Sequence, residues 1–67
     1  MTQTESILEA LQHGDRLTPI DALERFRCFR LAARIDDLRR AGYMIQTHMH
    51  QHGRKKWAEY RLWKPDA

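Results

Sequence analysis

The spacing of apolar residues changes from a helical period to a strand period past the middle of the chain. Up to residue 41, apolar residues recur three and four positions apart, as on one face of an α-helix. After Gly42, apolar and polar residues alternate from Tyr43 to His50 and again from Glu59 to Trp63, which is typical of strands. The pattern therefore predicts an α+β chain with helices first and a hairpin last.

Two short helices are expected in the first part of the chain. Residues 4–13 carry apolar side chains at helical spacing, and Gly14 follows where a left-handed C-terminal residue favours glycine. A second helix over residues 19–26 begins after Thr18, whose hydroxyl can cap free amides, and with Pro19, whose φ suits the first helical position. The apolar stripe that we expect this helix to bury consists of Ile20, Leu23 and Phe26.

A third helix is predicted over residues 29–41. Leu31, Ile35 and Leu38 recur at i, i+4 and i+7, which places them on one face of the helix. Gly42 follows as the expected C-terminal cap. These three apolar residues are therefore the expected core contribution of this helix.

The alternating segments predict an antiparallel hairpin over residues 43–63, with its tip near Gln51–Lys55. Residues 64–67 are expected to form a frayed tail, because Pro65 cannot donate to a strand ladder. Trp57 and Trp63 fall on the face opposite Tyr60 and Leu62. We expect Trp57 to cover the edge of the core and Trp63 to be available for a dimer contact.

Length and composition limit the protein to one small domain. A chain of 67 residues can form a single modest core, and its one cysteine, Cys28, has no partner for an internal disulfide. Cys28 is expected to pack at a helix turn as a small apolar group. No apolar run approaches the ~18 residues that a membrane span needs, and no signal-peptide pattern is present, so a cytoplasmic location is expected.

Charge is distributed unevenly along the chain. Residues 1–24 carry five acids and one arginine, a net −4, whereas residues 25–67 carry eleven bases and four acids, a net +7. Lys and Arg side chains that neutralise phosphates dominate non-specific affinity for nucleic acids. The second part of the chain is therefore suited to an anionic polymer.

Two helices, a tight turn, a third helix and a basic hairpin form the element order of a winged helix-turn-helix. The segment LTPIDALERFRCFRLAARIDDLRRAGYMIQT, followed by a glycine-tipped hairpin ending in YRL, resembles the small winged helix-turn-helix domain proteins of bacteria and their phages. The resemblance covers roughly residues 5–62. It implies DNA binding, with the third helix in the major groove, and a role in transcription or in the phage life cycle.

The resemblance implies that the early exposed positions of the third helix face the DNA. Arg30 and Ala33 are the expected base-reading residues, and Arg34 and Asp37 are further candidates. Arginine can bind guanine with two hydrogen bonds, alanine can contact a thymine methyl, and aspartate can accept from the cytosine amino group. Arg27, in the turn before the helix, is better placed for a phosphate.

The hairpin tip supplies a second set of candidate DNA contacts: His52, Arg54, Lys55 and Lys56. Such side chains would follow the DNA backbone or enter the minor groove, which adds salt-dependent affinity but little sequence information. A charged tip is also common simply because tips are solvated.

The charges of the third helix have a structural alternative. Arg30 with Asp37, or Asp36 with Arg40, could form pairs within a solvated helix face. Asp36 and Asp37 would also repel phosphates, so they either read bases or weaken the DNA-binding hypothesis.

Metal binding and catalysis are poorly supported. His48, His50 and His52 alternate and would share one face of a strand, but a zinc site normally has four ligands and Cys28 is far along the chain. No nucleophile and base pattern and no glycine-rich phosphate loop is present, so no enzyme activity, cofactor or metal is expected.

The sequence thus predicts a sequence-specific protein that binds double-stranded DNA, acting as a homodimer because one small module buries little DNA surface. The alternative is a protein-interaction module on the same scaffold, such as a phage-encoded inhibitor of a host protein.

Overall fold

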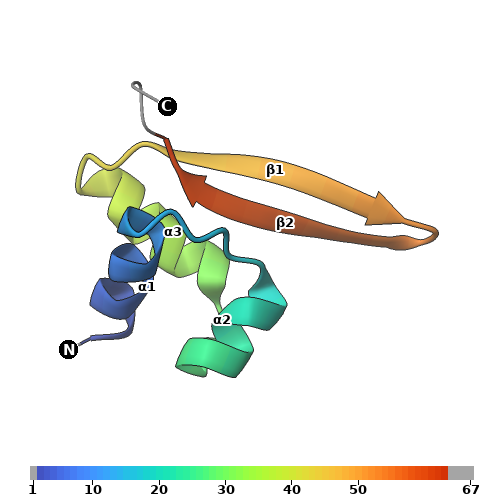
Figure 1. The fold of residues 1–67 in the computed structure, drawn as a ribbon, viewed down its shortest axis with the longest axis horizontal. Coiled ribbons are helices and arrows are strands. Elements are labelled where there is room, and N and C mark those ends of the chain that lie inside the picture. Colours follow the sequence, from blue (N-terminus) through green and yellow to red (C-terminus); the bar gives the residue numbers. More distant parts are fainter. Residues whose placement is uncertain (1, 64–67) are drawn as a thin grey trace.

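The computed structural model describes residues 2–63, so the tail expected at 64–67 lies outside the described residues. Three helices precede a two-stranded antiparallel hairpin, and the hairpin extends beyond the helices at one side (Figure 1). The α+β winged helix-turn-helix architecture expected from the sequence is therefore confirmed. Its elements are α1 (Gln3–Gln12), α2 (Pro19–Phe26), α3 (Leu31–Arg40), β1 (Ile45–His52) and β2 (Lys55–Leu62). Among residues 2–63 no helix has the length and apolar character to cross a membrane.

The ends of α2 follow from local chemistry. The Thr18 hydroxyl accepts from the Asp21 amide at 3.2 Å, and the Asp21 carboxylate accepts from the Thr18 amide at 3.1 Å. This reciprocal capping box satisfies two polar groups at the helix start. At the other end Arg27 is left-handed, with φ +53°, and its amide donates to the Leu23 carbonyl. The helix therefore stops after two turns.

The third helix begins later than predicted. Its first residue is Leu31 instead of residue 29, and Ala41 is its C-cap. Arg30 has φ −130° and ψ 63°, which is not helical, and the Cys28 amide is directed back to the Ala22 carbonyl. Phe29 and Arg30 therefore belong to the turn between α2 and α3. The first helix also lies one residue earlier than the predicted 4–13.

One core joins all five elements. Its buried residues are Ile7, Ala10, Leu11, Leu17, Ala22, Cys28, Leu31, Ile35, Leu38, Ile45 and Tyr60. The three residues predicted from α3 are among them, and Cys28 packs at the helix turn as expected.

The prediction for the apolar stripe of α2 is wrong for Ile20 and Leu23 and is confirmed in part for Phe26. Ile20 is 67% exposed and Leu23 is 42% exposed, whereas Ala22 is completely buried and Phe26 is only partly buried. Because alanine has no side-chain atom beyond Cβ, α2 can lie close to its neighbours at Ala22. The larger side chains of Ile20 and Leu23, on the neighbouring part of the helix surface, remain exposed to solvent.

The hairpin meets the helices through one face of its sheet. Ile45 pairs with Leu62 and the register runs to His52 opposite Lys55. Ile45 and Tyr60 are buried on the inner face. The turn lies at residues 53–54, so Lys55 and Lys56, predicted at or next to the tip, begin β2.

Trp57 does not cover the core as predicted. It lies on the outer face, half-buried, where its ring stacks on that of His50 with centroids 5.5 Å apart. The hydrophobic residues that pack against the core from β2 are Ala58 and Leu62 instead. The alternation of side chains along the strands was predicted correctly. Trp57, however, packs on His50, which is also on the outer face, and not on the edge of the core.

We expect Ile35→Val and Ile20→Val to have different effects on stability. Ile35 is completely buried, so losing one methylene should lower the free energy of unfolding by about 1 kcal/mol. The same change at Ile20 removes a mostly exposed methylene and should leave it nearly unchanged. Urea denaturation followed by circular dichroism measures both; equal losses would contradict the assignment of the core.

Candidate nucleic-acid interface

The charged residues of α3 form two ion pairs within the helix. Arg34 Nη2 lies 3.2 Å from Asp37 Oδ2, and Arg40 Nη2 lies 2.9 Å from Asp36 Oδ2. The Asp36–Arg40 pair was the structural alternative weighed from the sequence, whereas Asp37 pairs with Arg34 and not with Arg30. The four charges cancel, so this surface of α3 is nearly neutral and repels phosphates less than two free carboxylates would.

Arg34 is held against its own helix. Its side chain is about one-third exposed, and its Nε is buried without a hydrogen-bond partner. Ala33 beside it is half-buried. A contact between Arg34 and a base would therefore require its pair with Asp37 to open or to turn outward.

Arg30 differs from the other arginines near α3. It is the N-cap residue of the helix, it is exposed, and no ion pair reaches it within residues 2–63. The side chain is therefore free to extend from the start of α3. Phe29, its neighbour, is 85% exposed and was not predicted to be a site residue.

The turn that carries Arg27 is anchored from α1. The amide nitrogen of the Gln3 side chain donates to the carbonyls of Phe26 and Arg27, both at 3.2 Å. Arg27 itself is exposed at the left-handed end of α2. No local pattern in the sequence could reveal this contact, because Gln3 lies more than 20 residues away.

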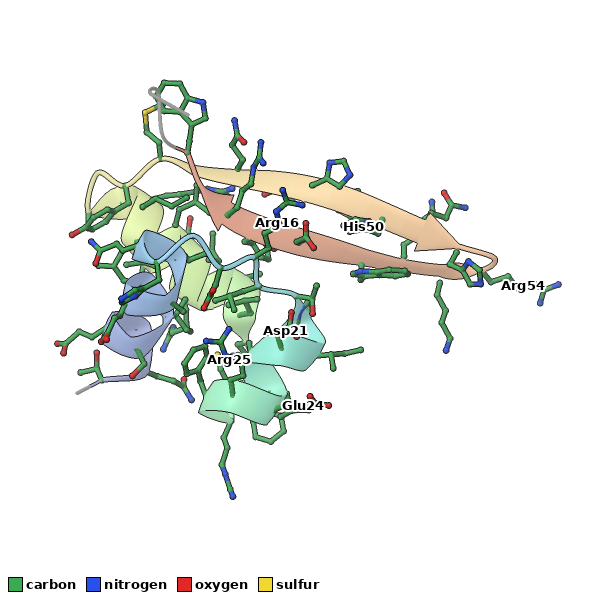
Figure 2. All side chains as sticks on the ribbon, in the orientation of Figure 1. Arg16, Asp21, Glu24, Arg25, His50 and Arg54 are labelled. Atoms are coloured by element: carbon green, nitrogen blue, oxygen red, sulfur yellow. The ribbon has the colours of Figure 1, made fainter. Side chains whose placement is uncertain are left out.

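Within the described part of the chain, the basic side chains of the hairpin tip form no ion pairs. Arg54, Lys55 and Lys56 are exposed, and so is the imidazole of His52. Figure 2 shows Arg54 projecting from the far end of the hairpin, away from the helices. The strongest free positive charge therefore lies at the tip, some distance from the neutral face of α3.

Arg39 connects α3 with the hairpin. Its Nε and Nη2 donate to the Ile45 carbonyl at 3.2 and 2.7 Å, and Nη2 also donates to the Thr47 hydroxyl at 2.8 Å. The planar guanidinium group suits such a forked contact. No role was predicted for Arg39 from the sequence, so this contact was missed. These bonds set the position of the hairpin relative to α3.

The histidines of the hairpin do not gather into a ligand set. His48 and His50 meet edge to face with centroids 4.7 Å apart, and His50 Nε2 lies 3.5 Å from Glu59 Oε1. Arg16 Nη1 lies 4.0 Å from the same carboxylate oxygen. Over residues 2–63, no group of three His, Cys, Asp or Glu side chains could hold a metal ion.

Arg39→Ala should loosen the hairpin. The substitution removes three hydrogen bonds, which we expect to lower the free energy of unfolding by about 1 kcal/mol given their partial exposure. Thr47→Val removes only one of them and should cost less. Urea denaturation of both variants checks the order; a larger loss for Thr47→Val would contradict the role of Arg39.

Comparison with known proteins agrees with this geometry. A family model described as a winged helix-turn-helix domain matches residues 2–65, which includes all three helices and both strands. No curated protein and no solved structure matches the chain. In such domains the second and third helices form the helix-turn-helix and the hairpin is the wing. The resemblance to winged helix-turn-helix domains inferred from the sequence is thus confirmed, and the chain belongs to the winged helix-turn-helix domain family.

Proposed function

We propose that this winged helix-turn-helix domain binds double-stranded DNA sequence-specifically and acts as a regulator of transcription or of a phage life cycle in the bacterial cytoplasm. The observation that carries the proposal is the set of unpaired cations at the start of α3 and at the wing tip. The second part of the chain also has a net charge of +7. Free Lys and Arg side chains provide the electrostatic affinity that DNA binding needs.

In this proposal α3 enters the major groove and Arg30 makes the leading base contact. Ala33 adds an apolar contact, and Asp37 accepts from a base amino group while one of its oxygens keeps the pair with Arg34. Arg27, at the anchored turn, contacts a phosphate. These assignments follow from position and exposure. Arg27, Arg30 and Ala33 lie at or near the start of α3, and Asp37 is exposed farther along the helix.

The wing supplies affinity in this proposal. His52, Arg54, Lys55 and Lys56 lie on the backbone or in the minor groove, and Arg39 keeps the wing at a constant position relative to α3. Two copies of the domain act on neighbouring half-sites, because a single small module buries too little surface for tight specific binding.

A protein-interaction role is the second candidate. It is favoured by the two ion pairs that neutralise α3 and by exposed apolar side chains at the other end of the wing, where Met44 is 62% exposed and Trp63 is 40% exposed. A host protein bound there would require Trp63 and not the cations of the wing tip.

A selection from random duplex DNA at two salt concentrations tests the proposed function. We expect the purified protein to enrich a short motif, with much weaker retention at the higher salt. A folded sample that retains no DNA at either salt would contradict DNA binding and favour the protein-interaction role.

Arg30→Ala should weaken binding to the selected site and relax its sequence preference. Losing a bidentate base contact costs about 1–3 kcal/mol, or roughly 5- to 150-fold in affinity for the preferred base. Arg25→Ala is the control, since Arg25 pairs with Asp15 away from the wing. Titrations against the site and its single-base variants give the comparison; an unchanged base preference would remove Arg30 from the base-reading set.

Arg54→Gln should weaken binding to all sequences by a similar factor. Removing one phosphate contact is expected to lower the slope of log affinity against log salt by about 1. Arg25→Gln makes the same charge change at a distance from the wing tip and should leave the slope unaltered. A change confined to particular sequences would mean that Arg54 reads bases.

A further inference from the structure

The free edge of strand β2 has backbone groups without partners. Leu17 pairs with Tyr60 through two hydrogen bonds, of 2.8 Å from the Leu17 amide and 2.7 Å from the Tyr60 amide, and the chain then leaves the sheet at Thr18. In an antiparallel strand, alternate residues direct their N–H and C=O groups to the same side. Ala58 and Lys56 therefore present theirs on the side of Leu17. No backbone hydrogen bond from residues 2–63 reaches them there.

A groove runs beside this edge, between the start of α2 and the wing tip. It has a volume of about 640 Å³. Its apolar lining comes from Pro19, Ile20 and Trp57. Its cationic lining comes from Arg54, Lys55 and Lys56.

The apolar part of the groove is built by residues that the core does not use. The Ile20 side chain is 67% exposed. The Trp57 ring packs on the ring of His50 and not on the core. The exposed apolar surface of Ile20 and Trp57 lies within reach of a peptide chain placed along the edge of β2. Burying it would contribute favourable free energy to a complex.

We propose that an extended acidic segment of a partner protein adds to this edge as a further strand, continuing the line of Leu17. Its backbone would pair with Ala58 and Lys56, an apolar side chain opposite Ala58 would lie in the groove against Ile20, and a carboxylate opposite Lys56 would meet the cations. Backbone pairing gives affinity in such strand addition, and the side-chain pockets give specificity. The cationic lining selects an acidic segment by charge complementarity.

Duplex DNA fits this groove less well than a peptide does. A phosphate backbone has oxygens that can accept from the Ala58 N–H, but it has no donor for the Ala58 C=O. Its charged oxygens would also lie against the apolar side chains of Ile20 and Trp57. The proposal therefore goes beyond DNA binding by α3 and the wing tip. Because Lys56 serves both uses, peptide and DNA would compete at the tip.

The test uses the intact protein and the peptide Ac-Ile-Thr-Glu-Thr-Glu-amide, which places Ile opposite Ala58 and the first Glu opposite Lys56 without overlapping Leu17. We expect excess peptide to slow hydrogen exchange of the Ala58 and Lys56 amides and to leave that of Trp57 unchanged, because the Trp57 amide faces β1. A peptide N-methylated at the residues that pair with β2 keeps the side chains and should not bind. Binding that is insensitive to N-methylation, or that leaves both amides exchanging as before, would overturn the proposal.

Two exposed residues of α2 provide matched variants. Ile20→Ser should lower the affinity for the peptide about tenfold. Leu23→Ser, on the same helix but outside the groove lining, should leave this affinity unchanged. Binding of duplex DNA should be unaffected by either substitution, so failure of this proposal is distinguishable from failure of DNA binding. If Ile20→Ser lowers the affinity for DNA, and the peptide does not slow exchange of the Ala58 and Lys56 amides, the groove belongs to the DNA interface and the proposal is wrong.

Discussion

The pairing of Leu17 with Tyr60 is the contact on which the arrangement of this small domain depends. Both residues are buried, and their two backbone hydrogen bonds join the connector between α1 and α2 to the wing. A two-stranded hairpin is only marginally stable by itself, so the wing needs this attachment. The same pairing ends at Thr18, where α2 begins, and thereby leaves the rest of the β2 edge open.

A second attachment gives the wing its functional relation to α3. The Arg39 guanidinium group donates hydrogen bonds to the Ile45 carbonyl and the Thr47 hydroxyl. Arg39 is therefore a structural cation, although it lies on an exposed helix face. Asp36 and Asp37 likewise hold two further arginines of α3. The positive charge of the second part of the chain is consequently divided into structural cations near α3 and free cations at the ends of the interface. Net charge alone could not separate these two groups.

Much of the architecture was predictable because it depends on local signals. The change of period after α3 separated helices from strands, the capping box at Thr18 began α2, and the stripe of α3 named its buried residues. The start of α3 was misplaced because Arg30 is not helical, with φ −130° and ψ 63°, and no local pattern in the sequence indicated this. Ile20 was assigned to the core because periodicity identifies an apolar face but not the depth to which it is buried.

The sequence by itself determined the element types, the family and the basic hairpin tip, since these arise from residues close together in the chain. Only the tertiary structure decided that Gln3 anchors the turn carrying Arg27 and that Trp57 packs on His50 outside the core. It also decided which face of α2 approaches its neighbours. These features depend on distances between side chains that are remote in sequence or on opposite strands, and such distances are set by how the elements pack together and not by local propensity or spacing.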